Sequence, residues 1–88
     1  MSWNYRVIKT EYEDPLCEEG VLSYFVIHEV HYDDNGVIDG WTIDPTYPLG
    51  DSFEELSAAI NLYQQALLQP ILEIEVVDGK QKLVEVKQ

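Results

Sequence analysis

The stretch Val21–Tyr32 constrains the fold most, because every second residue from Leu22 to Tyr32 is apolar, with His28 as the one exception. Side chains of a β-strand point to opposite faces in turn, so this pattern predicts a strand with one face buried. The other parity is apolar only in its middle, which indicates a central strand. The buried parity is predicted to be Leu22, Tyr24, Val26, His28, Val30 and Tyr32.

The next four residues, Asp33–Gly36, predict a hairpin turn. Their final Asn-Gly pair suits a two-residue turn, which would place Val30 opposite Trp41. A three-residue loop with a left-handed glycine competes with it and would place Glu29 opposite Trp41, on the other face. The apolar match of Val30 with Trp41 favours the first register. The following strand is expected over Val37–Asp44.

The remaining segments complete an α+β domain that spans residues 1–88. A first strand is expected at Trp3–Thr10, followed by a loop at Glu11–Gly20. A helix is expected at Phe53–Leu68, and strands at Ile71–Val77 and Lys82–Val86, joined by an Asp-Gly turn. The expected fold is an antiparallel sheet in the order β-β-β-α-β, with a fifth strand and one helix packed on one face.

The helix carries two stripes with different expected roles. One stripe recurs at spacings of three and four and is predicted to face the sheet: Phe53, Leu56, Ile60, Tyr63 and Leu67. The second is predicted to face away from the sheet: Ala58, Leu62, Gln65 and Gln69. An uncharged outer stripe is unusual for a solvated surface in an acidic chain. We expect it to contact a partner or a second copy, centred on Leu62.

The segment Asp44–Leu56 leads from strand to helix and has two interpretations. Ser52 is predicted to cap the helix, with Glu55 three residues on completing a capping box. These residues would then be structural. The alternative is that the loop holds Tyr47 and Leu49 outward as recognition residues.

The charge distribution excludes several classes of function. The chain has 17 acidic and 5 basic residues, for a net charge of −12. From Thr10 through Gly79 there is no lysine or arginine, while 16 of the 17 acids lie there. Nucleic acids and anionic membranes both attract cations, so neither is an expected partner. The acidity serves solubility, or it suits a basic protein partner or mimicry of a nucleic acid's charge.

No pattern for catalysis, a cofactor or a metal stands out. The two histidines, His28 and His31, are three residues apart, so a strand places them on opposite faces. Cys17 is the one cysteine and has acidic neighbours, which make a thiol a poor nucleophile. A lone cysteine fits a reducing compartment, and the first residues lack the apolar run of a signal peptide. We therefore expect a cytoplasmic protein that is not an enzyme.

Several phrases resemble a family of small bacterial proteins that has no assigned function. The phrases are Trp3-x-Tyr5-Arg6-Val7-Ile8, Ile27-His28-Glu29-Val30-x-Tyr32-Asp33, Trp41-Thr42-x-Asp44-Pro45 and Pro48-x-Gly50-x-Ser52-x-Glu54-Glu55-Leu56. More loosely, strands followed by Pro-x-Gly-x-Ser-x-Glu-Glu-Leu and a helix are similar to HicB-type antitoxins. That resemblance implies a partial RNase H-like domain that binds a small toxin with RNase activity.

Three hypotheses about function follow from the sequence. The first is a small acidic, non-catalytic protein-binding module, antitoxin-like, that masks a basic partner. The second is a nucleic-acid mimic that inhibits a DNA- or RNA-binding protein. The third is a small hydrolase or ligand-binding protein. Strongly salt-sensitive capture of basic partners would favour the first two over the third.

Overall fold

The computed structural model describes residues 2–13, 16 and 21–86 of the chain. Its elements are β1 (Ser2–Glu13), β2 (Val21–Tyr32), β3 (Ile38–Trp41), α1 (Phe53–Ala66), β4 (Leu72–Val77) and β5 (Lys80–Glu85). The α+β class, the single helix and the strand after the Asp-Gly turn agree with the sequence prediction. β1 continues into the segment predicted as a loop, and α1 ends at Ala66 instead of Leu68. The rest of that loop, apart from Leu16, lies outside the described residues.

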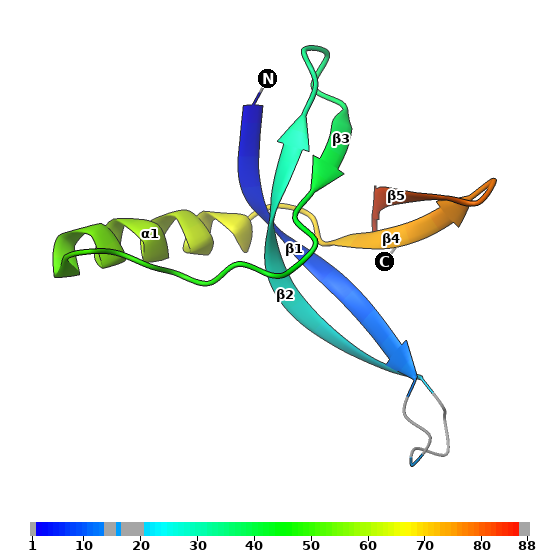
Figure 1. Cartoon of the computed structure of the whole chain (residues 1–88), viewed down its shortest axis with the longest axis horizontal. Coiled ribbons are helices and arrows are strands. Elements are labelled where there is room, and N and C mark those ends of the chain that lie inside the picture. The colour runs from blue at the N-terminus through cyan, green and yellow to red at the C-terminus, as the bar shows by residue number, and fades with distance from the viewer. Residues whose placement is uncertain (1, 14–15, 17–20, 87–88) are drawn as a thin grey trace.

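The five strands form one mixed sheet in the order β3-β2-β1-β4-β5 (Figure 1). Three junctions are antiparallel, but β4 runs parallel to β1, with Ile8 opposite Leu72 and Lys9 opposite Glu73. The prediction of a wholly antiparallel sheet is therefore wrong. A helical connection returns the chain to the far side of β1, and such a crossover lets the next strand enter in the same direction. Two strands follow the helix, so the order is β-β-β-α-β-β.

Both hairpin turns use backbone conformations of positive φ. In the β2–β3 turn Gly36 has φ of 79°, and the Asp33 N–H donates to the Val37 carbonyl oxygen at 2.8 Å. This is the three-residue loop, and not the two-residue turn that the Asn-Gly pair favours. In the β4–β5 turn Asp78 and Gly79 have φ of 53° and 78°. That is the two-residue turn that Asp-Gly predicts.

A bulge in β3 nevertheless restores the favoured register. Next to the turn Tyr32 faces Ile38, but beyond it Val30 faces Trp41, because the register shifts by one residue. Asp39 is the extra residue at this shift. Two residues on the bulged strand then oppose one on its partner, so Ile38 and Trp41 both turn toward the core.

The buried core lies on the face of the sheet opposite α1. It consists of Ile8, Val30, Leu72 and Leu83, with Tyr32, Ile38 and Trp41 packed against it. The other parity of β1 contacts the helix, where the rings of Tyr5 and Tyr63 lie 4.4 Å apart between centroids. The sheet curls over its own core, since Trp41 of β3 and Ile74 of β4 line one small hollow of about 120 Å³.

Most of α1 is exposed, and Figure 1 shows it projecting from the sheet instead of lying across it. Its buried residue is Ala66. The stripe predicted to face the sheet is only partly covered: Phe53 is 83% exposed and Leu67 is 68% exposed, while Leu56 and Tyr63 are half-buried. The reason is geometric. α1 contacts β1 through its C-terminal half, so its first turns extend beyond the sheet.

Candidate protein-binding surface

An uncharged groove runs between the C-terminal half of α1 and the start of β1. It has a volume of about 360 Å³ and is lined by Trp3, Asn4, Tyr5, Leu62, Gln65, Ala66 and Gln69. None of these side chains carries a formal charge at neutral pH. Aromatic rings beside amides are typical of surfaces that bind other proteins, where the rings supply area and the amides supply hydrogen bonds. We call this feature the helix groove.

Tyr5 lines the helix groove and contacts both of its neighbouring aromatic rings. Its ring meets Trp3 edge-on with centroids 5.3 Å apart, and it also packs against Tyr63 of α1. Burial raises the pKa of the Tyr5 hydroxyl above its ordinary value, and the neighbouring Tyr63 hydroxyl and Glu29 carboxylate raise it further. Tyr5 is neutral at physiological pH, as a tyrosine of ordinary pKa already is, and the raised pKa extends its neutral range to higher pH.

The groove contains three residues of the outer stripe predicted from the sequence, Leu62, Gln65 and Gln69. The helical period predicts that these three residues face away from the sheet. In the structure they lie beside the start of β1, so that prediction is wrong. Ala58, the fourth member, is exposed and lies outside the groove. Trp3 was not among the predicted site residues. The signal that could have found it is the aromatic parity of the first strand, in which Trp3 and Tyr5 share one face.

The loop before α1 presents two aromatic or aliphatic side chains to solvent. Tyr47 is 73% exposed and Leu49 is 65% exposed. The loop is fixed at its start, because the Thr46 N–H donates to the Ile27 carbonyl oxygen at 2.8 Å and so prolongs the pairing along β2. The exposure of Tyr47 and Leu49 fits the hypothesis that they are recognition residues. Their role in binding stays a prediction.

The cap of α1 is built as the sequence predicts, with one change of partner. The Glu55 backbone N–H donates to Ser52 Oγ at 3.1 Å. Glu55 Oε2 accepts from the backbone N–H of Asp51 at 2.9 Å, one residue earlier than in a standard capping box. Gly50 approaches the first turn so closely that an added Cβ would lie 2.8 Å from the Glu55 carbonyl carbon. Both Ser52 and Glu55 therefore have structural roles.

Arg6 is buried and links the end of α1 to the sheet. One of its terminal nitrogens donates to the Tyr32 hydroxyl at 2.9 Å, and the other to the Pro70 carbonyl oxygen at 2.8 Å. The Tyr32 hydroxyl in turn donates to Asn4 Oδ1 at 2.8 Å. Arg6 is only 7% exposed, so it is not free to neutralise a phosphate. The sequence gives no signal for this role, since it depends on a carbonyl 64 residues away.

The two histidines lie on opposite faces of β2, as their spacing predicts, and each has its own partner. His28 is buried, and its Nδ1 lies 2.9 Å from the Thr42 carbonyl oxygen. A carbonyl only accepts, so Nδ1 carries the proton. His31 Nε2 lies 3.1 Å from Glu29 Oε1. Both are ordinary strand residues by these contacts.

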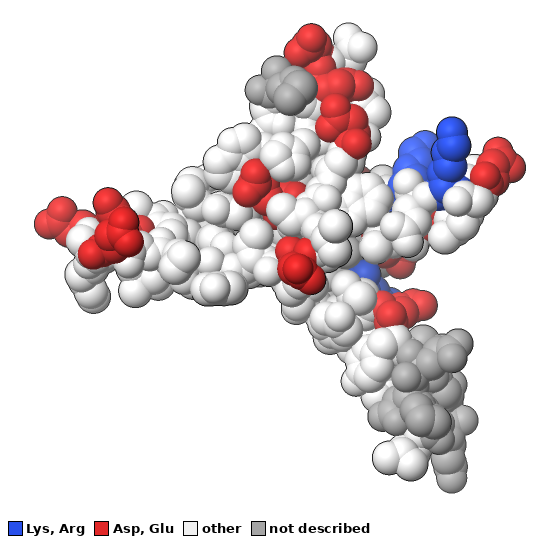
Figure 2. All heavy atoms as spheres, in the orientation of Figure 1, with Lys and Arg blue, Asp and Glu red and all other residues white. Residues whose placement is uncertain are grey.

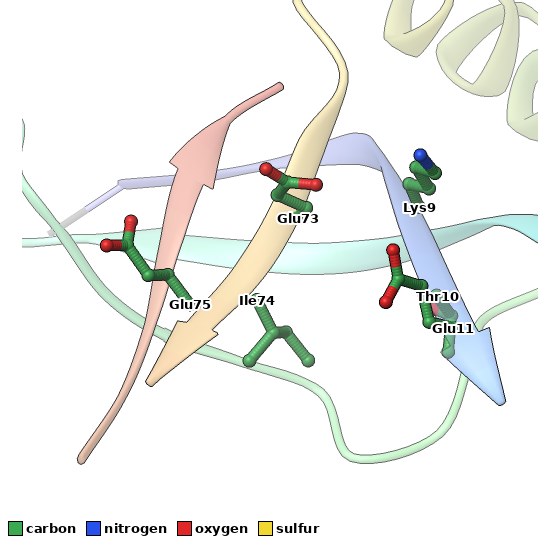
Figure 3. Close-up of a pocket in the computed structure, with 6 residues that line it drawn as sticks. All are labelled: Lys9, Thr10, Glu11, Glu73, Ile74 and Glu75. Atoms are coloured by element: carbon green, nitrogen blue, oxygen red, sulfur yellow. The ribbon is translucent and has the colours of Figure 1, made fainter. Parts of the chain in front are cut away.

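A second hollow, of about 410 Å³, opens where β1 and β4 diverge (Figure 3). It is lined by Lys9, Thr10, Glu11, Glu73, Ile74 and Glu75. Figure 3 shows its three carboxylates spread across the hollow and not converging on one point. Within residues 2–13, 16 and 21–86, no group of three histidine, cysteine or acidic side chains is placed to hold a metal ion. The hollow therefore lacks a gathered ligand set.

On the surface, charged side chains lie at the N-terminal end of α1 and on the hairpins, and not along the body of α1. Figure 2 shows acidic groups at the outer end of α1 and near the β2–β3 turn, lysines on the β4–β5 hairpin, and no charge along the body of α1. The acids at the helix end are Glu54 and Glu55 in the first turn, where the helix dipole favours them.

Comparison with known protein families, with curated proteins and with solved structures gives no match. In the described ranges, no helix has both the length and the apolar character that crossing a bilayer requires.

Proposed function

We propose that the chain is a small acidic, non-catalytic protein-binding module that masks a basic partner, in the manner of the HicB-type antitoxins that its sequence resembles. The observation that carries the proposal is a set of exposed carboxylates in the part of the chain without lysine or arginine. They include Asp34, Asp39, Asp44, Asp51, Glu54 and Glu55. Complementary charge speeds association and selects among partners, so such a surface suits a basic protein.

The start of α1 offers the best combination for this contact. Asp51 and Glu54 are exposed there, close in sequence to the exposed Tyr47 and Leu49. Binding surfaces commonly combine an aromatic or aliphatic anchor with a charged rim, because the anchor supplies affinity and the rim supplies orientation. We infer that the basic partner binds at this end of the molecule.

A nucleic-acid mimic is the alternative function. A mimic needs carboxylates in one extended row that copies the phosphate spacing. On the face in Figure 2 acidic groups gather near the β2–β3 turn, and others lie apart from them at the outer end of α1 and at the β4–β5 turn, so they do not form one continuous row. This arrangement supports masking of a protein over mimicry. The two differ in the partner that they imply: an antitoxin-like module binds a basic RNase and stops it from cleaving RNA, whereas a mimic binds a protein that binds DNA or RNA without cleaving it.

Affinity capture from an extract of the source cells, followed by titration with the purified partner, tests the proposal. We expect a basic partner whose affinity falls steeply between about 0.05 and 0.5 M salt. Glu54→Gln should weaken binding several-fold. Asp78→Asn removes one charge at the distant β4–β5 turn and should leave the affinity unchanged.

A partner that is acidic or neutral, or one whose affinity does not respond to salt, would contradict the proposal. A captured partner that binds DNA or RNA without cleaving it would favour the mimic instead.

A further inference from the structure

The stripe of α1 that is predicted to face the sheet is only partly covered in the single chain: Leu56 and Tyr63 are half-buried, and the other three residues are exposed. It consists of Phe53, Leu56, Ile60, Tyr63 and Leu67, which alternate at spacings of three and four. This is the spacing by which one helix packs along another. Phe53, Ile60 and Leu67 are 83%, 42% and 68% exposed. We call this stripe the helix seam. A contiguous apolar surface of this kind marks an interaction site.

Charge indicates what covers the helix seam. Residues 56–72 contain no charged side chain, although the whole chain has a net charge of −12. A basic partner gains no electrostatic attraction from an uncharged surface. A second copy of so acidic a chain needs an uncharged contact surface, since carboxylates that face each other would repel. The charge pattern therefore selects a second copy over a basic protein.

The chain exposes more area than a compact monomer of its mass, enough to supply an interface of standard size. The chain exposes 6949 Å², whereas a compact monomer of 10.2 kDa exposes about 5,300 Å². Its radius of gyration is 14.9 Å, against about 12 Å for a compact chain of this length. The difference in area is about 1,600 Å² per chain and is shared between α1 and the projecting hairpins (Figure 1). About half of it would supply the roughly 800 Å² that each partner buries in a standard interface.

We propose that α1 packs antiparallel against α1 of a second copy, around a two-fold axis at Ile60. Ile60 lies midway between Phe53 and Leu67, so this axis places Phe53 of one copy beside Leu67 of the other and Ile60 beside itself. A helix of 14 residues is roughly 21 Å long. Antiparallel packing therefore holds the two copies of Glu54 and Glu55 at opposite ends, where a parallel pair would bring them together. The contact centres on Ile60 and leaves Leu62 in the helix groove.

Sedimentation equilibrium of the full chain tests this dimer. The wild type should have twice the 10.2 kDa mass of one chain. Ile60→Glu should raise the dimer dissociation constant at least about 100-fold, because it sets two carboxylates face to face. Leu62→Glu is the matched control, since Leu62 is 47% exposed and Ile60 42%. It should change the constant less than about threefold, and circular dichroism should show equal helix content in both.

The axis itself can be tested by mixing variants. Ile60→Glu mixed with Ile60→Lys should restore a dimer, because position 60 meets position 60. Should Ile60→Glu fail to fold, Ile60→Cys in a Cys17→Ser background should join two copies under mild oxidation, and Leu62→Cys should not. A wild type that stays monomeric, or a dimer that Leu62→Glu disrupts as fully as Ile60→Glu, overturns the proposal.

Discussion

Gly50 decides how the chain enters α1. The backbone of Gly50 passes so near the first helical turn that a side chain would press on the Glu55 carbonyl carbon and the Leu56 nitrogen. Both are backbone atoms inside the helix, so they yield only if the helix shifts. The turn before α1 therefore requires glycine at position 50 for lack of space, in addition to the cap that Ser52 provides.

Gly50→Ala is expected to lower the free energy of unfolding by about 1–3 kcal/mol, the usual cost of overpacking. Gly40→Ala is the control, because a Cβ at Gly40 meets nothing within 4 Å. That variant should stay within about 0.5 kcal/mol of the wild type. Urea unfolding followed by circular dichroism measures both. Equal stability of the two variants would show that the backbone around Gly50 and the first turn of α1 shifts to accommodate the added methyl group without cost.

At the scale of elements, the contact of α1 with β1 depends on a neutral Tyr5. Burial among the groove residues, together with Tyr63 and Glu29, raises the pKa of its hydroxyl. A raised pKa means that the folded chain holds the proton more tightly than the unfolded chain. The contribution to stability is therefore complete below about pH 10, the ordinary tyrosine pKa, and is lost as pH rises through the folded value.

We therefore expect the wild type to lose stability above about pH 10 more steeply than Tyr5→Phe, which keeps the ring but cannot ionise. Urea unfolding at a series of pH values from neutral to alkaline measures this difference. Because the other tyrosines titrate in both proteins, only the difference between them reports on Tyr5. Stability profiles that run parallel over this pH range would show that ionisation of the Tyr5 hydroxyl does not affect the stability of the fold.

At the scale of the whole molecule, the positions of the cations reinforce what the composition indicates. Arg6 is buried against Tyr32 and Pro70, and Lys80 and Lys82 lie together on the β5 strand. Among the described residues the exposed cations are too few, and too close to acids, to form a continuous basic surface. Nucleic-acid affinity comes mainly from neutralised phosphates, which this surface does not offer.

The purified chain should accordingly not bind duplex DNA or structured RNA, even near about 50 mM salt, where non-specific binders respond. A gel-shift titration measures this, with a basic protein of similar size as the positive control. Saturable binding at low micromolar concentration would contradict the charge argument.

Local chemistry is enough to predict much of the fold. The strand β2, the Asp-Gly turn before β5 and the cap at Ser52 each rest on neighbours within a few residues, and each is present in the structure. Of the β2 row predicted to be buried, His28 and Val30 are buried but Tyr24 is 44% exposed, because β1 and β2 extend together beyond the rest of the sheet (Figure 1). The predicted pairing of Val30 with Trp41 is also present, but for a different reason. A three-residue turn and a compensating bulge at Asp39 produce it together, and no local pattern separates that combination from a simple two-residue turn.

Only the tertiary structure decided where β4 pairs and what α1 covers. The parallel junction of β4 with β1 depends on the path of the whole helical connection, which no local signal encodes. The helical period correctly groups Phe53, Ile60 and Leu67 in one stripe, but it cannot say what lies against them. A periodic apolar stripe predicts that one face of the helix is buried. It does not predict which surface buries that face, because this depends on contacts distant in sequence. In the single chain Phe53, Ile60 and Leu67 stay exposed, because α1 contacts β1 through its C-terminal half and its first turns extend beyond the sheet (Figure 1).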